Sequence, residues 1–131
     1  MMQRIAIIED EPSICELYKI KFEKEGYEVQ VAGNGIEGLR LIESFKPHIV
    51  LLDLLMPQMN GDEMLQKLRE TEWGRSIKVI ILTNVSRLEA PDNLNGLGIS
   101  RYIVKAELTA TQVAEVVKEE LAKVTIVRPH L

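Results

Sequence analysis

Cysteine, histidine and tryptophan are scarce in this sequence, which has one, two and one of them respectively. Cys15 has no partner for an internal disulfide and falls inside a helical pattern, so we expect a reduced, buried thiol in a cytoplasmic protein. His48 and His130 lie far apart in the chain and lack the spacing of metal ligands. These absences argue against a disulfide scaffold and against a metal site built from imidazole groups.

Long apolar runs and clusters of positive charge are also missing. No stretch approaches the length of a membrane span, and the N-terminus lacks the basic region and cleavage site of a signal peptide. The net charge is −4, and no stripe of Lys and Arg is present to neutralise phosphates. We therefore expect a protein that contacts neither membranes nor nucleic acid directly.

What is present fits one globular domain. The chain of 131 residues is long enough for a single core, and 46% of its residues are apolar. We place the domain at residues 1–124 and a short C-terminal tail at 125–131.

Short apolar runs alternate with segments of helical periodicity along the domain. The apolar runs cover residues 4–8, 27–32, the start of 49–57, 78–82 and 101–104. Five such strands alternating with five helices predict an α/β fold, in which helices cover both faces of a doubly wound parallel sheet. The favoured strand order is 2-1-3-4-5, and such sheets bind ligands at the carboxyl ends of strands 1 and 3.

The helix boundaries carry several local signals. Asn34 with Glu37 and Thr109 with Gln112 are spaced as capping boxes, and Asn60-Gly61 is a turn signal before the third helix. The fourth helix is the weakest, because Pro91, Gly96 and Gly98 leave it little length. We expect it to be short, irregular or mobile.

Polar residues follow four of the predicted strands at the point where each strand ends. They are Glu9, Asp10, Asp53, Thr83 and Lys105. Each has an ordinary structural explanation by itself, such as a helix cap or a turn, but all of them meet at the edge where this fold binds ligands. Two carboxylates about 5 Å apart repel each other by roughly 3 kcal/mol at an effective dielectric constant near 20, so the cluster favours a divalent cation such as Mg²⁺ or Mn²⁺.

Four motifs in this order resemble the receiver domain of two-component response regulators, in particular CheY-like stand-alone receivers. They are Ile7-Ile8-Glu9-Asp10-Glu11, the stretch from Leu51-Leu52-Asp53 through Met56-Pro57-Gln58-Met59 to Asn60-Gly61, Ile81-Leu82-Thr83, and Tyr102-Ile103-Val104-Lys105. The match extends over nearly the whole chain. It implies the flavodoxin-like (βα)5 fold and a phosphoprotein of a signal-transduction pathway.

The resemblance also implies roles for the residues at the strand ends. Asp53 would be the phosphoacceptor and, with Asp10 and the backbone carbonyl of Leu55, a direct ligand of Mg²⁺, whereas Glu9 would act on the metal through water. Such a protein is not a conventional enzyme, because it catalyses only its own phosphorylation and dephosphorylation.

By the same resemblance, Thr83 and Lys105 would bind phosphoryl oxygens, and Tyr102 would turn inward behind Thr83. The change would alter the surface formed by the fourth helix, the fifth strand and the fifth helix. The partners implied are a sensor histidine kinase or a histidine phosphotransfer protein and a downstream effector protein. We expect a monomer, or a weak dimer through that surface.

Two departures from the family pattern affect the chemistry. Ala106 follows Lys105 where most receivers have a proline in a cis peptide, and the sequence leaves open whether this bond is cis or trans. By the resemblance, Leu55 and Val85 occupy the positions that flank the phosphoryl group in this family. Both are aliphatic, so we expect them to hinder attacking water and to prolong the life of the acyl phosphate.

Three alternatives differ in class or in extent. A phosphatase of the haloacid dehalogenase type needs a second Asp two positions after the nucleophile, where this chain has Leu55. A flavodoxin-like electron carrier needs a first loop rich in glycine and hydroxyls, where this chain has three acidic residues. The N-terminal receiver of a longer transcriptional regulator remains open, although the few residues after Lys123 favour a stand-alone signalling relay.

Overall fold

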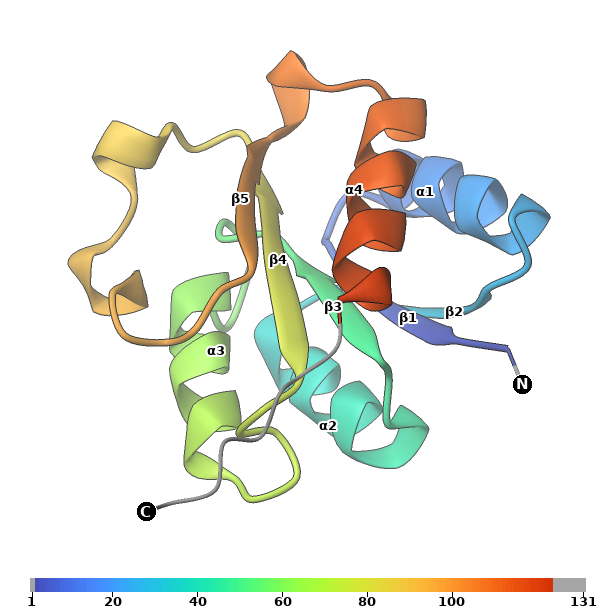
Figure 1. The fold of residues 1–131 in the computed structure, drawn as a ribbon. Coiled ribbons are helices and arrows are strands. Elements are labelled where there is room, and N and C mark those ends of the chain that lie inside the picture. The colour runs from blue at the N-terminus through green and yellow to red at the C-terminus, as the bar shows by residue number, and fades with distance from the viewer. Residues whose placement is uncertain (1, 124–131) are drawn as a thin grey trace, which may run out of the picture.

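The computed structural model describes residues 2–123, and within them a parallel sheet lies between two layers of helices (Figure 1). The sheet has five strands in the order β2-β1-β3-β4-β5, which confirms the predicted topology. The strands are β1 (Arg4–Ile8), β2 (Glu28–Ala32), β3 (Ile49–Leu52), β4 (Lys78–Thr83) and β5 (Arg101–Val104). The α-helices are α1 (Pro12–Lys24), α2 (Gly35–Phe45), α3 (Gly61–Glu70) and α4 (Ala110–Ala122).

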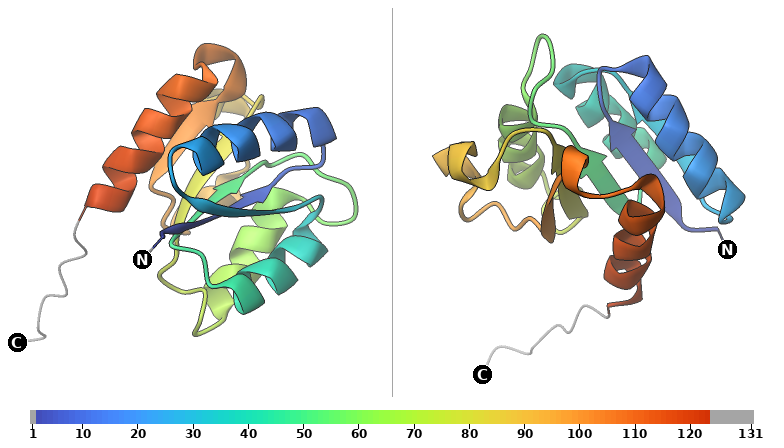
Figure 2. Two further views of the ribbon diagram at one scale, coloured as in Figure 1. Left: turned by 90° about the vertical axis from the view of Figure 1, so that its right-hand side faces the viewer. Right: turned by 90° about the horizontal axis from the view of Figure 1, so that it is seen from above.

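Alternate residues of the buried strands face two separate hydrophobic clusters, one on each side of the sheet. Ile5, Leu51 and Ile80 pack against α1 and α4 on one face. The neighbouring residues along the same strands, such as Ala6 and Leu52, pack against α2 and α3 on the other. Figure 2 shows the same two-sided arrangement. Because both faces of the parallel sheet are covered, β3 is apolar throughout and the centres of β1 and β4 are continuous apolar runs.

The helix boundaries follow the local sequence signals. The Asn34 side chain accepts a hydrogen bond from the Glu37 backbone N–H at 2.8 Å, and Thr109 forms a complete capping box with Gln112. Gly26 has a φ of 94°, a conformation that favours glycine, directly after α1 ends. No helix within residues 2–123 is long and apolar enough to cross a membrane.

The chain between β4 and β5 differs from the prediction of a fourth helix. It contains only two single turns of 3₁₀ helix, η1 (Arg87–Glu89) and η2 (Asp92–Leu94), and Pro91 lies between them. Gly96 and Gly98 then adopt φ values of 83° and 70°, which a continuing helix does not allow. The surface predicted from the fourth helix, fifth strand and fifth helix is therefore formed by η1, η2, β5 and α4.

Two further predictions concern the bounds of the second strand and of the C-terminal tail. The second strand begins at Glu28 and not at Tyr27. The predicted tail at 125–131 lies outside the described residues.

Candidate functional site

Two carboxylates lie side by side because β1 and β3 are neighbours in the sheet and end at the same level. The Asp53 backbone N–H donates to the carbonyl of Ile8 at 3.0 Å, so the ladder between the strands extends one residue beyond β3. The Glu9 backbone N–H likewise donates to Ala32 at 2.9 Å. Main-chain hydrogen bonds thus fix the starting positions of both side chains.

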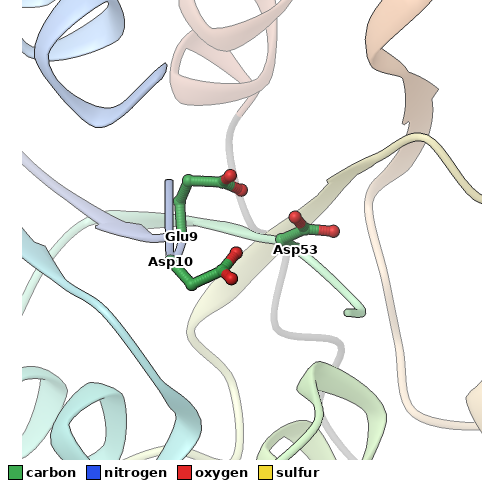
Figure 3. Close-up of side chains that lie close together, drawn as sticks. All are labelled: Glu9, Asp10 and Asp53. Atoms are coloured by element: carbon green, nitrogen blue, oxygen red, sulfur yellow. The ribbon is translucent and has the colours of Figure 1, made fainter. Parts of the chain in front are cut away.

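The sequence predicted that Glu9, Asp10 and Asp53 meet, and the structure brings them together. One carboxylate oxygen from each residue lies within 4.8 Å of the others, and Figure 3 shows the three groups facing a common space. Glu9 and Asp53 are buried, whereas Asp10 is exposed. We call this cluster, which is exposed to solvent at Asp10, the acidic pocket.

Lys105 reaches the same pocket from the end of β5. Its Nζ lies 2.7 Å from Oε2 of Glu9 and 2.9 Å from Oδ2 of Asp53, and the lysine side chain is only 11% exposed. Burial by itself would lower the pKa of Lys105, but the hydrogen bonds to Glu9 and Asp53 outweigh it and raise that pKa. One ammonium facing three carboxylates leaves the pocket negatively charged whenever all of them are ionised.

The two buried carboxyl groups differ in acidity. Burial, followed by hydrogen bonding with Asp53, raises the pKa of Glu9 to about 7. Burial also acts against the charged form of Asp53, but hydrogen bonding with Glu9, Thr83 and Lys105 outweighs it and lowers the pKa of Asp53. The negative charge is therefore held on Asp53, and a charge on Glu9 is costly in the absence of a further cation.

Gly61, which in the sequence is part of a turn signal and ends the second motif, packs directly behind Asp53. A Cβ atom at this position would overlap the backbone carbonyl of Asp53, and the Gly61 N–H donates to the carbonyl of Leu54 at 2.9 Å. Only glycine allows this close approach of two backbone segments. The Asn60-Gly61 signal therefore has a packing function in addition to its turn geometry.

The loop after β3 also contacts the acidic side chain. The Leu55 backbone N–H donates to Oδ1 of Asp53 at 3.3 Å, while the Leu55 side chain is 61% exposed at the rim.

Thr83 and Tyr102 are linked through Val85. Thr83 is fully buried at the end of β4, and its Oγ1 accepts a hydrogen bond from the Val85 N–H at 3.3 Å. The Tyr102 hydroxyl donates to the Val85 carbonyl at 2.7 Å. Arg87, which the sequence analysis did not single out, donates from Nη2 to the Tyr102 carbonyl at 2.6 Å, and its guanidinium carbon lies 5.6 Å from the centre of the tyrosine ring.

The Lys105–Ala106 peptide is trans, since no peptide bond among residues 2–123 is cis. The chain continues from Lys105 into a single 3₁₀ turn, η3 (Lys105–Glu107). Lys105 reaches both carboxylates from this trans loop, so proline is not needed after the lysine to place its side chain in the pocket.

The donor set of the pocket matches a hard divalent cation. Carboxylate oxygens are the ligands that Mg²⁺ prefers, and it is commonly held by one or two of them together with water. Three such groups converge here, one of them exposed to solvent. The excess of negative charge supplies the electrostatic reason to bind the ion.

Comparison with known proteins identifies the family. Residues 5–118 match the family model of the response regulator receiver domain. The chain belongs to this family. The resemblance read from the four motifs is confirmed, and so are the CheY-like fold and the assignment to two-component signalling.

Curated relatives of this receiver domain are longer than the chain. The DNA-binding dual master transcriptional regulator RpaA of Synechocystis sp. is 37% identical over 106 residues, which are 79% of this chain and 43% of that protein. The DNA-binding response regulator MtrA of Mycolicibacterium smegmatis is 33% identical over 107 residues, which are 80% of this chain and 45% of that protein. The matched residues thus span less than half the length of these relatives, and the whole chain about half.

Solved receiver structures match along nearly the full length. A CheY-like receiver domain protein from Methanospirillum hungatei has a TM-score of 0.84 and 32% identity, covering 92% of this chain and 94% of its own. The response regulator TrrA from Thermotoga maritima, solved in complex with Mg²⁺ and BeF, has a TM-score of 0.78 and 33% identity, covering 90% and 98%.

Proposed function

We propose that this receiver domain accepts a phosphoryl group on Asp53 from the phosphohistidine of a sensor histidine kinase or a histidine phosphotransfer protein. The observation that carries the proposal is the contact of Lys105 with Asp53 at 2.9 Å, inside a pocket that also holds Glu9 and Asp10. A nucleophilic carboxylate needs to be ionised, and the lowered pKa of Asp53 keeps it so.

The transfer replaces a bond between phosphorus and nitrogen with a bond between phosphorus and oxygen. A carboxylate oxygen of Asp53 attacks the phosphorus atom, a P–O bond forms, and the P–N bond to the histidine breaks, so the imidazole leaves and regains its proton from solvent. Phosphoryl transfer of this kind depends mainly on positioning and on charge stabilisation. Lys105 exchanges part of its contact with Asp53 for one with the new phosphoryl oxygens.

The pocket would hold Mg²⁺ or Mn²⁺ through Asp10, Asp53 and the backbone carbonyl of Leu55, with Glu9 contributing through water. When bound, the ion supplies the positive charge that makes an acidic site receptive to phosphate. The proximity of the three carboxylates supports this ligand set. The chain's own catalysis would be limited to its phosphorylation and dephosphorylation.

The response to phosphorylation would begin at Thr83. Its hydroxyl accepts from Val85, and its own proton, which bonds to Asp53 in the unphosphorylated protein, would pass to a phosphoryl oxygen. A shift of Thr83 toward the phosphate would draw Val85 along and release the Tyr102 hydroxyl from the Val85 carbonyl. Tyr102 could then turn inward, which would reshape the surface of η1, η2, β5 and α4 for an effector protein or for a weak dimer.

Leu55 and Val85 would make the acyl phosphate long-lived. The exposed Leu55 side chain lies at the rim of the pocket, where it would limit the approach of water to the phosphorus atom. We expect the half-life of the acyl phosphate in the isolated, Mg²⁺-loaded domain to be longer than seconds. The loss of the added phosphoryl mass with time measures it. A half-life of only seconds would contradict this part of the proposal.

The decisive test is the intact mass after incubation with acetyl phosphate and Mg²⁺. The parent should gain the mass of one phosphoryl group, and Asp53→Asn should gain none. Asp92→Asn is the matched control, since Asp92 is an exposed residue of η2 away from the cluster, and it should behave as the parent. Equal modification of the Asp53→Asn variant would remove Asp53 as the acceptor.

A second possibility concerns the extent of the protein, and it is favoured by the curated relatives, whose matched receivers occupy 43% and 45% of their length. In that case this receiver would control an attached output domain in a transcriptional regulator. The chemistry at Asp53 would be identical. Immunoblotting of the native protein with an antibody to this domain distinguishes the two, because a stand-alone relay migrates near 14.9 kDa.

A further inference from the structure

The segment 84–100, which joins β4 to β5, is held at its two ends by hydrogen bonds from different side chains. At the end near the acidic pocket, the Val85 carbonyl accepts the Tyr102 hydroxyl and Arg87 donates to the Tyr102 carbonyl. Between the ends, Leu88 is 99% exposed, and Leu94 is the residue that packs deeply, in the cluster shared with α3. A groove of about 740 Å³ lies between η1, η2 and Tyr102.

The far end is held by one side chain of α3. Arg69 donates from Nε to the Leu97 carbonyl at 2.7 Å and from Nη2 to the Gly98 carbonyl at 3.2 Å. Its Nη1 donates to the carbonyls of Gly74 and Ile77 at 2.9 and 2.7 Å, in the loop between α3 and β4. Within residues 2–123 Arg69 forms no ion pair, so its donors serve backbone carbonyls from two separate loops.

The chemistry of this contact requires a guanidinium. Its planar fork presents five donors in fixed directions, whereas a lysine ammonium is a single point with three. Arg69 therefore joins the start of β4 and the start of β5 to the end of α3 in one rigid unit. Gly96 and Gly98, with positive φ values, bend the chain so that the carbonyls reach it.

We propose that Arg69 is a positioning residue that fixes the far end of the segment, so that phosphorylation of Asp53 moves residues 84–94 and leaves the start of β5 in place. The need for a fixed end follows from the geometry of the pocket. Lys105 comes directly after β5 and lies within 2.9 Å of Asp53, so a shift of β5 would withdraw the lysine from the phosphoryl group. The movement of 84–94 rests on the proposed function, whereas the anchor does not.

Hydrogen exchange of the unphosphorylated protein tests the anchor. The amides to follow are Leu97, which donates to Leu94, and Ser100, which donates to Val79. In Arg69→Met we expect their exchange to accelerate by about tenfold or more, because the carbonyls that hold this end lose their donors. Arg75→Met is the matched control, since Arg75 lies in the same pocket as Arg69 and its side chain makes no hydrogen bond in the described residues.

Two further measurements separate a local effect from general loosening. The amides of Leu51 and Ile80 in the centre of the sheet should exchange at the parent rate in both variants. Arg69→Lys should be intermediate, because an ammonium has three donors and can serve some of these carbonyls but not all. Unchanged exchange at Leu97 and Ser100 in Arg69→Met, or equal acceleration in Arg75→Met, would overturn the anchor.

Hydrogen exchange in the presence of Mg²⁺ and beryllofluoride, a phosphoryl mimic, tests whether residues 84–94 move while the start of β5 stays in place. In the parent the changes should fall at Glu89 and Ala90 and be absent at Leu97 and Ser100, whereas in Arg69→Met they should extend to both ends. Equal changes at both ends of the parent would overturn the division. No response anywhere in the parent would overturn the proposed switch and leave the anchor supported by the exchange of the unphosphorylated protein.

Discussion

The acidic pocket and the segment 84–100 meet at the carboxyl edge of the sheet, where the segment begins, but they are built differently. In the pocket, Glu9 and Asp53 extend the strand ladder, and Lys105 bonds to both of them from inside the fold. The segment has no α-helix and exposes Leu88 almost completely. The ionisable groups of the pocket therefore lie on strands that are buried in the sheet, whereas the segment that we expect to move has few buried contacts.

The largest expected effect concerns the backbone contact behind Asp53. Gly61→Ala should lower the free energy of unfolding by about 3 kcal/mol, because the new methyl group overlaps the Asp53 carbonyl and the two segments have to separate. Chemical denaturation measures the change. Gly33→Ala is the matched control at the same edge of the sheet, where nothing lies within 4 Å of the added Cβ, and it should cost far less. Equal costs would show that the pocket is no more tightly built than its surroundings.

A smaller effect of opposite sign concerns the charge on Glu9. Glu9→Gln should raise the stability of the metal-free protein at pH 8 by about 2 kcal/mol, because it removes a buried charge that the fold disfavours. Burial and the neighbouring Asp53 raise the pKa of Glu9 to about 7, so its carboxylate is mostly charged at pH 8 at a cost to the fold, and loss of the Lys105 contact reduces the gain from removing it. Thermal melting at pH 8 measures it, with Glu11→Gln as the exposed neighbour for comparison.

The pKa shifts of Glu9 and Asp53 also predict how the stability of the metal-free protein changes with pH. Since the folded state holds the proton of Glu9 more tightly than the unfolded state, this group's contribution is fully present below pH 4.5 and is lost as the pH rises through about 7. The lowered pKa of Asp53 acts in the opposite sense but only as the pH falls below its usual value of 3.8. The metal-free parent should therefore melt at lower temperature at pH 8 than at pH 5, and Mg²⁺ should restore more at pH 8. A melting temperature that rises with pH in the parent would contradict this account.

The smallest expected effect lies in the exposed segment. Leu88→Ala should change the free energy of unfolding by less than about 0.5 kcal/mol, because a side chain that is 99% exposed buries no apolar surface. Leu94→Ala in the same segment should cost about 2 kcal/mol or more, since Leu94 is buried against α3. Denaturation of the two variants side by side measures the contrast. A large cost at Leu88 would show that the segment is more firmly packed than its exposure indicates.

The sequence by itself determined the order of the strands and the residues at their ends. The centre of a parallel strand covered on both faces is apolar, so the first polar residue after each run, such as Asp53 after Leu52, marks where the strand ends. The capping residues Asn34 and Thr109 could be predicted for a similar reason, because a cap contacts a residue only three positions away.

Only the tertiary structure decided how those residues meet. Lys105 contacts Glu9 across 96 residues and Asp53 across 52, and no local pattern specifies that distance or the difference in acidity that follows from it. The roles of Gly61, Arg69 and Arg87 depend on carbonyl groups in other segments. In place of the expected fourth helix, the structure has two short 3₁₀ turns. The physical reason is that periodicity and capping are set by neighbours in sequence, whereas close approach, burial and pKa are set by neighbours in space.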